Sequence, residues 1–285
     1  MYYFLDMHDN KLNFIQNISE ETCIEVMQSY DSAKEVLRFF NMGKCVKDAL
    51  DSLLVWNKEA NPSSIYLMRN THTAERLVRG FLFELRTCLD YMEAYIKDEY
   101  GTDSDFWRIF QQSTNEAYDK HPEYAFTYHL RNCAQHCRNV VHGFNGAVGI
   151  GVSSNTERLL REYKKWKPID KDFLANSGAE IDLPTTFIKA FDAFSEALRK
   201  IMNYLLNSNS VGKKVLFLRQ WGDNLRSCFG HEVHCFHLVN LQFSDGKSAQ
   251  IEDLKYDGVE INAYPLDWEL IYELSASITP IQKSK

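Results

Sequence analysis

The stretch Thr73–Tyr100, TAERLVRGFLFELRTCLDYMEAYIKDEY, carries the clearest secondary-structure signal in this 285-residue chain. Its apolar side chains recur every three or four residues, which places them on one face of an α-helix. Charged side chains lie off that face, and Gly101 follows as a helix stop. The segment therefore predicts a long amphipathic helix within a mainly α-helical protein. Its apolar face consists of Leu77, Phe81, Leu85, Cys88, Met92 and Tyr95.

Further helices are expected on both sides of this segment. Ser19 is a suitable N-cap before two acidic residues, and Gly43 is expected to end the helix that follows. Pro122 is expected to open a helix that stops at Gly143, because proline is well tolerated at the first helical position. A loop is expected around Pro168. The expected helices span residues 19–41, 44–58, 105–118, 122–142, 155–166 and 184–209.

The character of the sequence changes near residue 210. The runs 215–218 and 234–243 are typical of strands, and Ser244–Lys247 is a turn signal. Residues 211–265 are therefore expected to be β-rich, with a short helix over 267–275, whereas residues 1–18 predict a strand or an irregular start. Asn61–Ser64 is the best linker candidate. The chain is accordingly divided into an N-terminal helical segment (1–65), a helical core (66–210) and a small α/β C-terminal region (211–285).

The composition is that of a globular protein, with 45% hydrophobic and 25% charged residues. A net charge of −7 argues against a protein whose whole surface grips nucleic acid, because such binding relies on Lys and Arg. A local basic groove remains open. One basic cluster is interpreted as a solvated helix face rather than a groove. It contains Arg158, Arg161, Lys164, Lys165, Lys167 and Lys171.

Seven cysteines are scattered along the chain without a CxxC pair, which favours a reducing compartment. The first residues, Met1–Leu5, lack the basic start and the length of a signal peptide. No apolar stretch is long enough to span a membrane. We therefore expect a cytoplasmic protein without membrane contact.

The run Arg131-Asn132-Cys133-Ala134-Gln135-His136 places a permanent cation, an amide and an imidazole within two helical turns. These are the groups needed to cleave RNA without a metal: a base for the ribose hydroxyl and a cation for the pentavalent phosphorus. Five residues at 100° each separate Arg131 from His136 by about 140° around the helix axis. One helix alone does not focus both side chains on one point. A two-fold dimer that pairs two copies of the run would do so.

The pattern Arg-polar-x-x-x-His late in a helix, preceded by a long amphipathic helix, resembles the HEPN superfamily. The similarity extends to Tyr124–Leu130, which leads into Arg131, and covers roughly residues 66–210. The resemblance implies a HEPN-like antiparallel helical bundle with a small β-rich C-terminal appendage. It also implies a metal-independent endoribonuclease, a homodimer that acts as a toxin or an anti-phage effector. An antitoxin or a phage-derived trigger would then control it, and no cofactor is expected.

The resemblance also assigns roles to three residues as catalytic candidates. Arg131 would bind the scissile phosphate, Asn132 would orient the phosphate or the histidine, and His136 would act as general base or acid. The products would carry 2′,3′-cyclic phosphate and 5′-hydroxyl ends. Some relatives carry a modified tyrosine two residues after the histidine, a position that Arg138 occupies in this chain. That form of control is therefore not expected.

Other interpretations stay open at this point. Arg131 could pair with an acid such as Asp90 or Glu84, leaving His136 as an interfacial histidine. The protein would then be a non-catalytic RNA- or nucleotide-binding module, or a helical dimerisation scaffold.

Further candidate motifs are weaker. A looser Arg-x4-His match spans Arg226–His231, where Gly230 argues against a helical site. Cys133, His136 and Cys137 could bind a metal, but two of them lie on the apolar face. A second cluster lacks a clear fourth zinc ligand and is interpreted as polar residues of one strand. It contains His231, His234, Cys235 and His237. No metal site is therefore expected.

Overall fold

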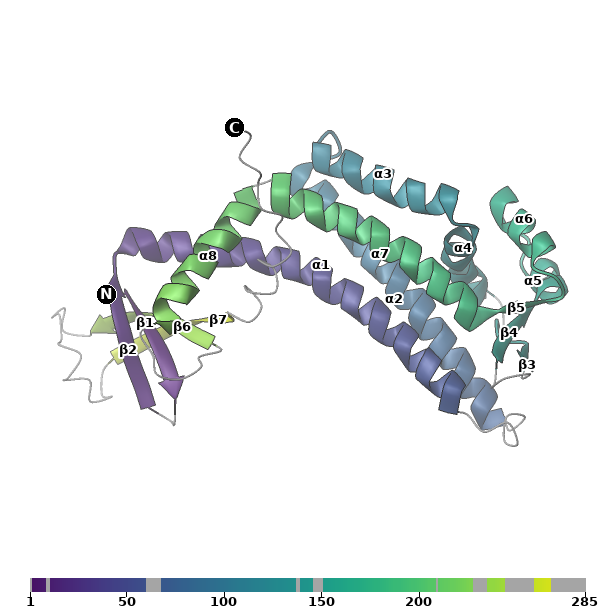
Figure 1. Cartoon of the computed structure of the whole chain (residues 1–285), viewed down its shortest axis with the longest axis horizontal. Helices are drawn as coiled ribbons and strands as arrows, with labels where there is room; N and C mark the ends of the chain where they lie inside the picture. Colours follow the sequence, from purple (N-terminus) through teal and green to yellow (C-terminus); the bar gives the residue numbers. More distant parts are fainter. Residues whose placement is uncertain are drawn as a thin grey trace. The chain divides into compact units, whose positions relative to one another are not determined.

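The computed structural model describes residues 2–8, 11–59, 68–136, 139–145, 151–208, 210–227, 235–243 and 259–267. Within these ranges the protein is mainly α-helical, with eight helices and seven short or medium strands (Figure 1). The chain forms two compact units, one of residues 39–204 and one of residues 1–38 with 205–285. The second of these combines both ends of the chain, an arrangement that the expected division into three consecutive segments did not include.

The unit of residues 39–204 is built on long helices. Two aromatic contacts show how its core is filled. The rings of Phe81 and Phe187 lie 4.7 Å apart between centroids, and Phe39 meets Tyr95 edge to face at 5.0 Å. Such buried aromatic pairs contribute large apolar areas to a core. The helices are α1 (Glu20–Glu59, which continues beyond this unit), α2 (Met68–Tyr100), α3 (Asp105–Lys120), α4 (Pro122–His136) and α7 (Leu183–Ser208).

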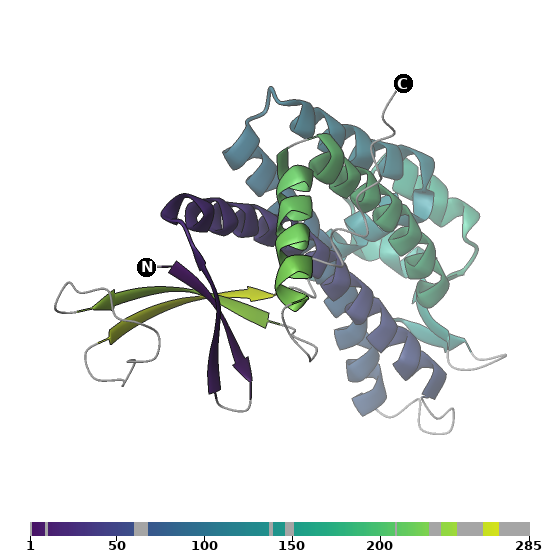
Figure 2. The same cartoon turned by 60° about the vertical axis from the view of Figure 1, so that its left-hand side comes forward.

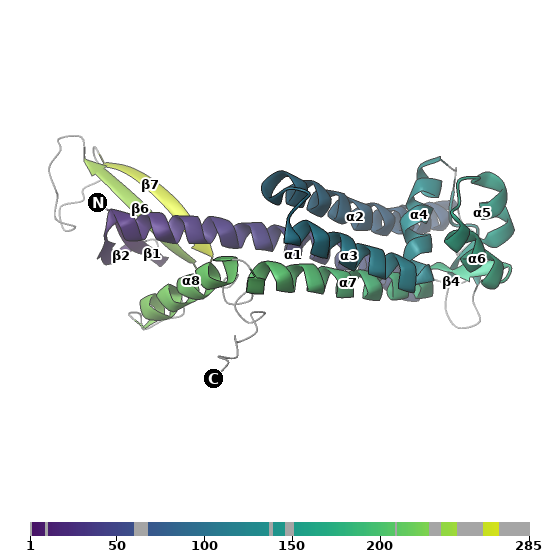
Figure 3. The same cartoon turned by 90° about the horizontal axis from the view of Figure 1, so that it is seen from above.

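A small antiparallel sheet and two short helices complete this unit next to α4 (Figure 3). The strands β3 (Gly143–Asn145), β4 (Gly151–Asn155) and β5 (Glu180–Asp182) form the sheet in that order. The helices are α5 (Thr156–Glu162) and α6 (Pro168–Asn176), and α6 packs on α4.

The other unit contains a four-stranded antiparallel sheet in the order β2-β1-β6-β7 (Figure 2). In it β1 (Tyr2–His8) pairs with β2 (Lys11–Ile18) as a hairpin, and β6 (Cys235–Phe243) pairs with β7 (Val259–Asp267). Strand β1 also pairs with β6, with Tyr2 opposite Asn240. The expected strands at the start of the chain and at 234–243 are confirmed, but their pairing was not foreseen.

The prediction that Gly43 ends a helix is wrong, because Gly43 lies inside α1, a continuous helix of 40 residues. Residues 44–58 are therefore not a separate helix. A Cβ atom added at Gly43 would lie only 2.5 Å from Cδ2 of Leu198 in α7. The missing side chain thus lets the two helices approach closely, which is a packing reason for a glycine inside a helix.

The prediction of a strand at residues 215–218 is also wrong, because α8 (Ser210–Arg226) occupies this region. Its buried residues recur at helical spacing; they are Val211, Val215, Leu218 and Leu225. The apolar run 215–218 fits a strand as well as a helix, because it is too short to show either periodicity. Pro168, expected in a loop, instead opens α6 as a first helical residue.

Some expectations lie outside the described residues, namely the linker 61–64, the turn 244–247 and the helix proposed beyond Asp267. Of the helices that the structure describes, none combines the length and the apolar character needed to cross a bilayer.

Candidate functional site

Helix α4 carries the Arg131–His136 run on its last two turns. Its buried face includes Tyr124, Phe126, Leu130 and Cys133, which fix the helix against its neighbours. The expected start at Pro122 is confirmed. Arg131 and Asn132 are half-buried and His136 is exposed, so the polar part of the run lies at the edge of the core.

Helices α2 and α4 run antiparallel in a register fixed by three contacts, each one helical turn from the next. These contacts join Arg79 to Ala134, Phe83 to Arg131, and Arg86 to Tyr128. In the first, the guanidinium donates a hydrogen bond to the backbone carbonyl. In the other two, a guanidinium carbon lies 5.4 Å and 4.6 Å from a ring centroid, the geometry of a cation–π contact. The packing of α2 against α4 therefore fixes the position of Arg131.

The Arg131 guanidinium is oriented by neutral groups. Its Nη1 donates to Oε1 of Gln135 at 2.5 Å and lies 3.4 Å from Oδ1 of Asn132, while its buried Nε has no hydrogen-bond partner among the residues that the structure describes. Within the described ranges no carboxylate forms an ion pair with Arg131. Asp90, one of the two acids considered as its partner, binds Arg86 instead, with Nη2 and Oδ1 2.6 Å apart. The positive charge of Arg131 is thus left without a protein counter-ion in this part of the chain.

His136 is the last residue of α4, and its ring faces another part of the fold. It lies nearly parallel to the ring of Tyr163, at 8° and with 6.5 Å between centroids. Tyr163 is buried at the C-cap of α5, so it provides a fixed platform. Among described residues, no hydrogen bond or ring contact joins His136 to Arg131. Asn132 contacts Arg131 rather than His136, so one protomer does not focus all three candidates on one point.

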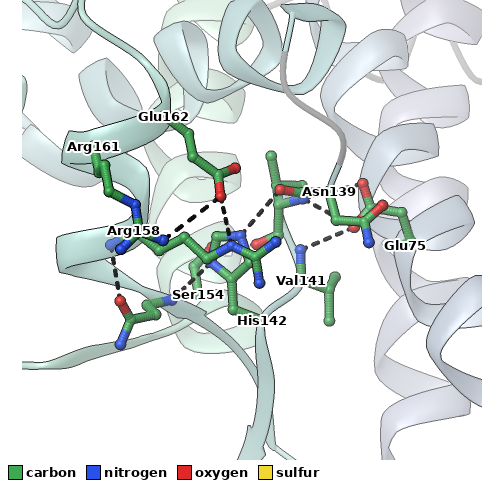
Figure 4. A network of polar contacts seen from close by, with 10 residues as sticks. Glu75, Asn139, Val141, His142, Ser154, Arg158, Arg161 and Glu162 are labelled. Carbon is green, nitrogen blue, oxygen red and sulfur yellow. Dashed lines mark hydrogen bonds and ion pairs between the residues drawn. The ribbon is translucent and has the colours of Figure 1, made fainter.

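Glu75 of α2 determines where the chain goes after α4 (Figure 4). Its carboxylate accepts the backbone N–H of Val140 at 3.1 Å through both oxygens and that of Val141 at 2.9 Å through Oε2. Arg79 Nε holds the same carboxylate at 2.7 Å. The predicted helix to His142 is therefore wrong: α4 ends at His136, since these amides bond to Glu75 instead of to a preceding helical turn.

His142 is a structural histidine. Its Nδ1 accepts the backbone N–H of Asn155 at 3.0 Å, which leaves Nε2–H to donate to the carbonyl of Asn139, also at 3.0 Å (Figure 4). The pKa of His142 lies below its ordinary value. The larger cause is burial, and the second is the nearby positive charge of Arg158. Because both ring nitrogens bond to backbone groups, His142 is not available as a catalytic base in this arrangement.

A second buried polar pair joins α4 to α6. Nδ1 of His129 lies 2.8 Å from Oδ2 of Asp170, and the same oxygen accepts the backbone N–H of Lys167 at 2.8 Å. Asp170 is fully buried. Neither this pair nor Glu75 was identified from the sequence, because their partners lie 41 and 65 residues away along the chain. No local motif signals such pairings.

The remaining candidate motifs do not form a site within the described residues. No group of three metal-ligating side chains occurs in the ranges that the structure covers. Cys133 is buried, and Cys137 and Arg138 lie outside those ranges. Cys235 and His237 lie in β6, whereas His231 and His234 are not described. In the basic cluster, Arg158 pairs with Glu162 at 2.7 Å.

Comparison with known proteins identifies no relative: no family model, no curated protein and no solved structure matches this chain.

Proposed function

We propose that this protein is a metal-independent endoribonuclease of HEPN type, in which Arg131, Asn132 and His136 form a composite site in a homodimer. The observation that carries the proposal is that Arg131 is held in place without an acidic partner among the residues that the structure covers. Its guanidinium is held by amide side chains and has no acidic partner within the described residues, and an exposed histidine follows five residues later on the same helix. A positioned cation without a counter-ion is what an RNA phosphate requires.

The chemistry follows from the two groups. His136 takes the proton of a ribose 2′-hydroxyl, and the resulting oxygen attacks the adjacent phosphorus. The bond from phosphorus to the 5′-oxygen breaks, and that oxygen leaves as a hydroxyl after it takes a proton from water, to which His136 returns the proton that it accepted. Arg131 stabilises the additional negative charge on the phosphate oxygens during the attack. The products are a 2′,3′-cyclic phosphate and a 5′-hydroxyl end.

The geometry of one protomer favours a composite site in a dimer. Within one protomer Arg131 packs on Phe83 of α2, whereas His136 stacks on Tyr163 beyond α5. The two side chains thus have different neighbours, as the separation of about 140° around the helix axis predicts. A two-fold axis beside the end of α4 would bring the Arg131 of one copy toward the His136 of the other.

The biological role that we propose rests on the resemblance to HEPN proteins. It is that of a cytoplasmic toxin or anti-phage effector, which an antitoxin or a phage-derived component would hold inactive until needed. A nuclease of this kind arrests growth by degrading cellular RNA, so its activity must be restrained in the resting cell.

The proposal is tested by incubating the protein with tRNA, mRNA and rRNA in the presence of EDTA and by determining the chemistry of the product ends. We expect cyclic phosphate ends from the wild type, and a loss of at least 100-fold in rate for Arg131→Ala and for His136→Ala. Matched controls are Arg199→Ala and His72→Ala, which remove an exposed arginine and an exposed histidine elsewhere in the same protein. Both controls should cleave at the wild-type rate.

The site assignment is wrong if Arg131→Ala and His136→Ala both fold and still produce cyclic phosphate ends at the wild-type rate. If the wild type binds RNA but never cleaves it, and His136→Ala binds equally well, the protein is a binding module. If it has no affinity for RNA even at low salt, the helices form an interaction scaffold.

A further inference from the structure

A cavity of about 330 Å³ lies between α2, α3 and α4, and the residues that line it on α4 are Tyr124 and Tyr128. Its volume is at the lower end of the range for small-molecule sites, roughly 300–1,000 Å³. The aromatic and amide side chains that line the cavity come from α3 and α4. They are Trp107, Phe110, Gln111, Asn115, Tyr124 and Tyr128.

The walls of the cavity are aromatic. Trp107 and Phe110 are both buried, and their rings are nearly parallel, at 25° with 5.6 Å between centroids. Tyr124 and Tyr128 also line the cavity, from α4. Tyr128 is fixed because the Arg86 guanidinium lies 4.6 Å from its ring centroid. Rigid rings around a small cavity favour a flat, aromatic ligand.

Two amide side chains lie at the cavity on the solvent side. Gln111 and Asn115 are four residues apart on α3, so they share one face of that helix, and both are exposed. Within the described residues, neither side-chain amide has a hydrogen-bond partner. Amides offer one acceptor and two donors each, which is the pattern that recognises the edge of a nucleobase.

The charges around the cavity are compensated. Arg86 is paired with Asp90 at 2.6 Å, and Glu93 is paired with Lys97 at 2.6 Å. A ligand that is itself highly charged would have to break one of these pairs. The cavity therefore suits the uncharged part of a ligand.

From these observations we infer that the cavity between α2, α3 and α4 binds a single nucleobase, which inserts between the aromatic walls and bonds to Gln111 and Asn115. The base comes either from a free nucleoside or nucleotide, or from an unpaired position of RNA. Tyr128 precedes Arg131 by one turn of α4, a rise of about 5 Å. If the proposed cleavage is correct, an RNA base held here would lie beside the phosphate that Arg131 binds, and the cavity would select the base next to the cleaved bond.

Binding is measured by isothermal calorimetry on the full chain, independently of cleavage. The probes are adenosine, guanosine, cytidine, uridine and a short single-stranded oligoribonucleotide, with ribose 5-phosphate as the probe that lacks a base. The test variant is the double substitution Gln111→Ala with Asn115→Ala, which removes both exposed amides without disturbing the core. The matched control is Gln112→Ala, because Gln112 is the next residue on α3 but bonds to Glu116 at 2.9 Å.

We expect at least one base-containing probe to bind, at least tenfold weaker binding to the double variant, unchanged binding to Gln112→Ala, and no binding of ribose 5-phosphate. Binding of nucleosides identifies a free nucleoside or nucleotide as the ligand, whereas binding of the oligoribonucleotide alone identifies RNA. The inference is overturned if no base-containing probe binds at about 1 mM, or if the double variant binds as tightly as the wild type. Base binding without RNA cleavage would remove the proposed function and leave this site intact; cleavage without base binding would do the reverse.

Discussion

Both carboxylate oxygens of Glu75 lie 3.1 Å from the backbone nitrogen of Val140, which is 65 residues later in the chain. This contact ties the segment after α4 to the first turns of α2. Arg79 of the same helix also donates a hydrogen bond to the carbonyl of Ala134. Helix α2 therefore contacts the backbone both before and after His136. The position of the candidate catalytic histidine therefore depends on a carboxylate that does not itself take part in the proposed reaction.

Replacing Glu75 by glutamine should lower the free energy of unfolding by about 2 kcal/mol, because hydrogen bonds to a charged acceptor are lost and an amide donor is brought against backbone N–H groups. Urea unfolding followed by circular dichroism measures the change. Glu84→Gln is the control, since Glu84 is exposed on the same helix and its substitution should change stability by no more than about 0.5 kcal/mol. Equal stability of the two variants would contradict the role assigned to Glu75.

Asp170→Asn should destabilise the protein by about 2 kcal/mol, because Asp170 is fully buried and accepts hydrogen bonds from His129 and from the backbone of Lys167. The loss should appear as a lower denaturation midpoint at an unchanged denaturant slope. Asp172→Asn, an exposed position on the same helix, serves as the comparison and should leave the midpoint unaltered. A wild-type midpoint for Asp170→Asn would show that the buried pair contributes no net stability.

Stability should fall as the pH drops below about 6.5, and His142 should account for part of this loss. Burial lowers the pKa of His142 in the folded protein below its ordinary value of 6.5. The unfolded chain therefore binds more protons than the folded one at mildly acidic pH, which favours unfolding by up to about 1.4 kcal/mol per pH unit. His142→Gln cannot gain this proton, so its unfolding free energy should depend less on pH between about 5 and 7. His72→Gln, an exposed control, should retain the wild-type pH dependence.

Cys88 should resist alkylation in the folded protein. Its side chain is buried, and burial raises the pKa of its thiol to about 12. At pH 8 its reactive thiolate is then roughly a thousandfold scarcer than in an ordinary exposed cysteine. Iodoacetamide labelling with peptide mapping should modify the exposed Cys45 first, and Cys88 only after denaturation. Equal labelling of both residues under native conditions would show that Cys88 is accessible.

Gln135→Glu should weaken RNA binding while the fold is retained. Gln135 already accepts a hydrogen bond from Arg131 at 2.5 Å, so a carboxylate there would become the counter-ion that Arg131 lacks in the described structure. Filter binding at low salt should show at least tenfold lower RNA affinity. Gln112→Glu adds the same charge on the exposed face of α3 and controls for the change in net charge. If both variants lose affinity equally, the effect is one of net charge, and Arg131 is not the phosphate contact.

The elements that the sequence predicted best are those with local signals. The apolar periodicity of α2 and the proline at the start of α4 lie within the elements that they define, and both predictions were confirmed. The relative direction of Arg131 and His136 likewise follows from helix geometry alone. These features need no knowledge of what the helices pack against.

The features that escaped prediction depend on residues far apart in the chain. Glycine is a common helix stop, yet Gly43 lies inside a helix. It is accommodated there because Leu198 of α7 packs where its side chain would be. The end of α4 is set by Glu75, which nothing near His136 indicates. Val215 and Leu218 illustrate a third cause, because a short apolar run fits a strand and a helix equally well until its buried partners are known.

The continuity of α1 determines how the helical unit can be isolated as a fragment. Phe39 and Gly43 both pack within the unit of residues 39–204, so a fragment that begins at residue 66 would lose the α1 residues that cover α2 and α7. A fragment that begins at residue 39 would keep them but would start in mid-helix, whereas the natural cap is Ser19, whose Oγ accepts the backbone N–H of Thr22 at 3.1 Å. Such a fragment needs an engineered capping residue, a serine or aspartate immediately before Phe39, to replace the start that it has lost.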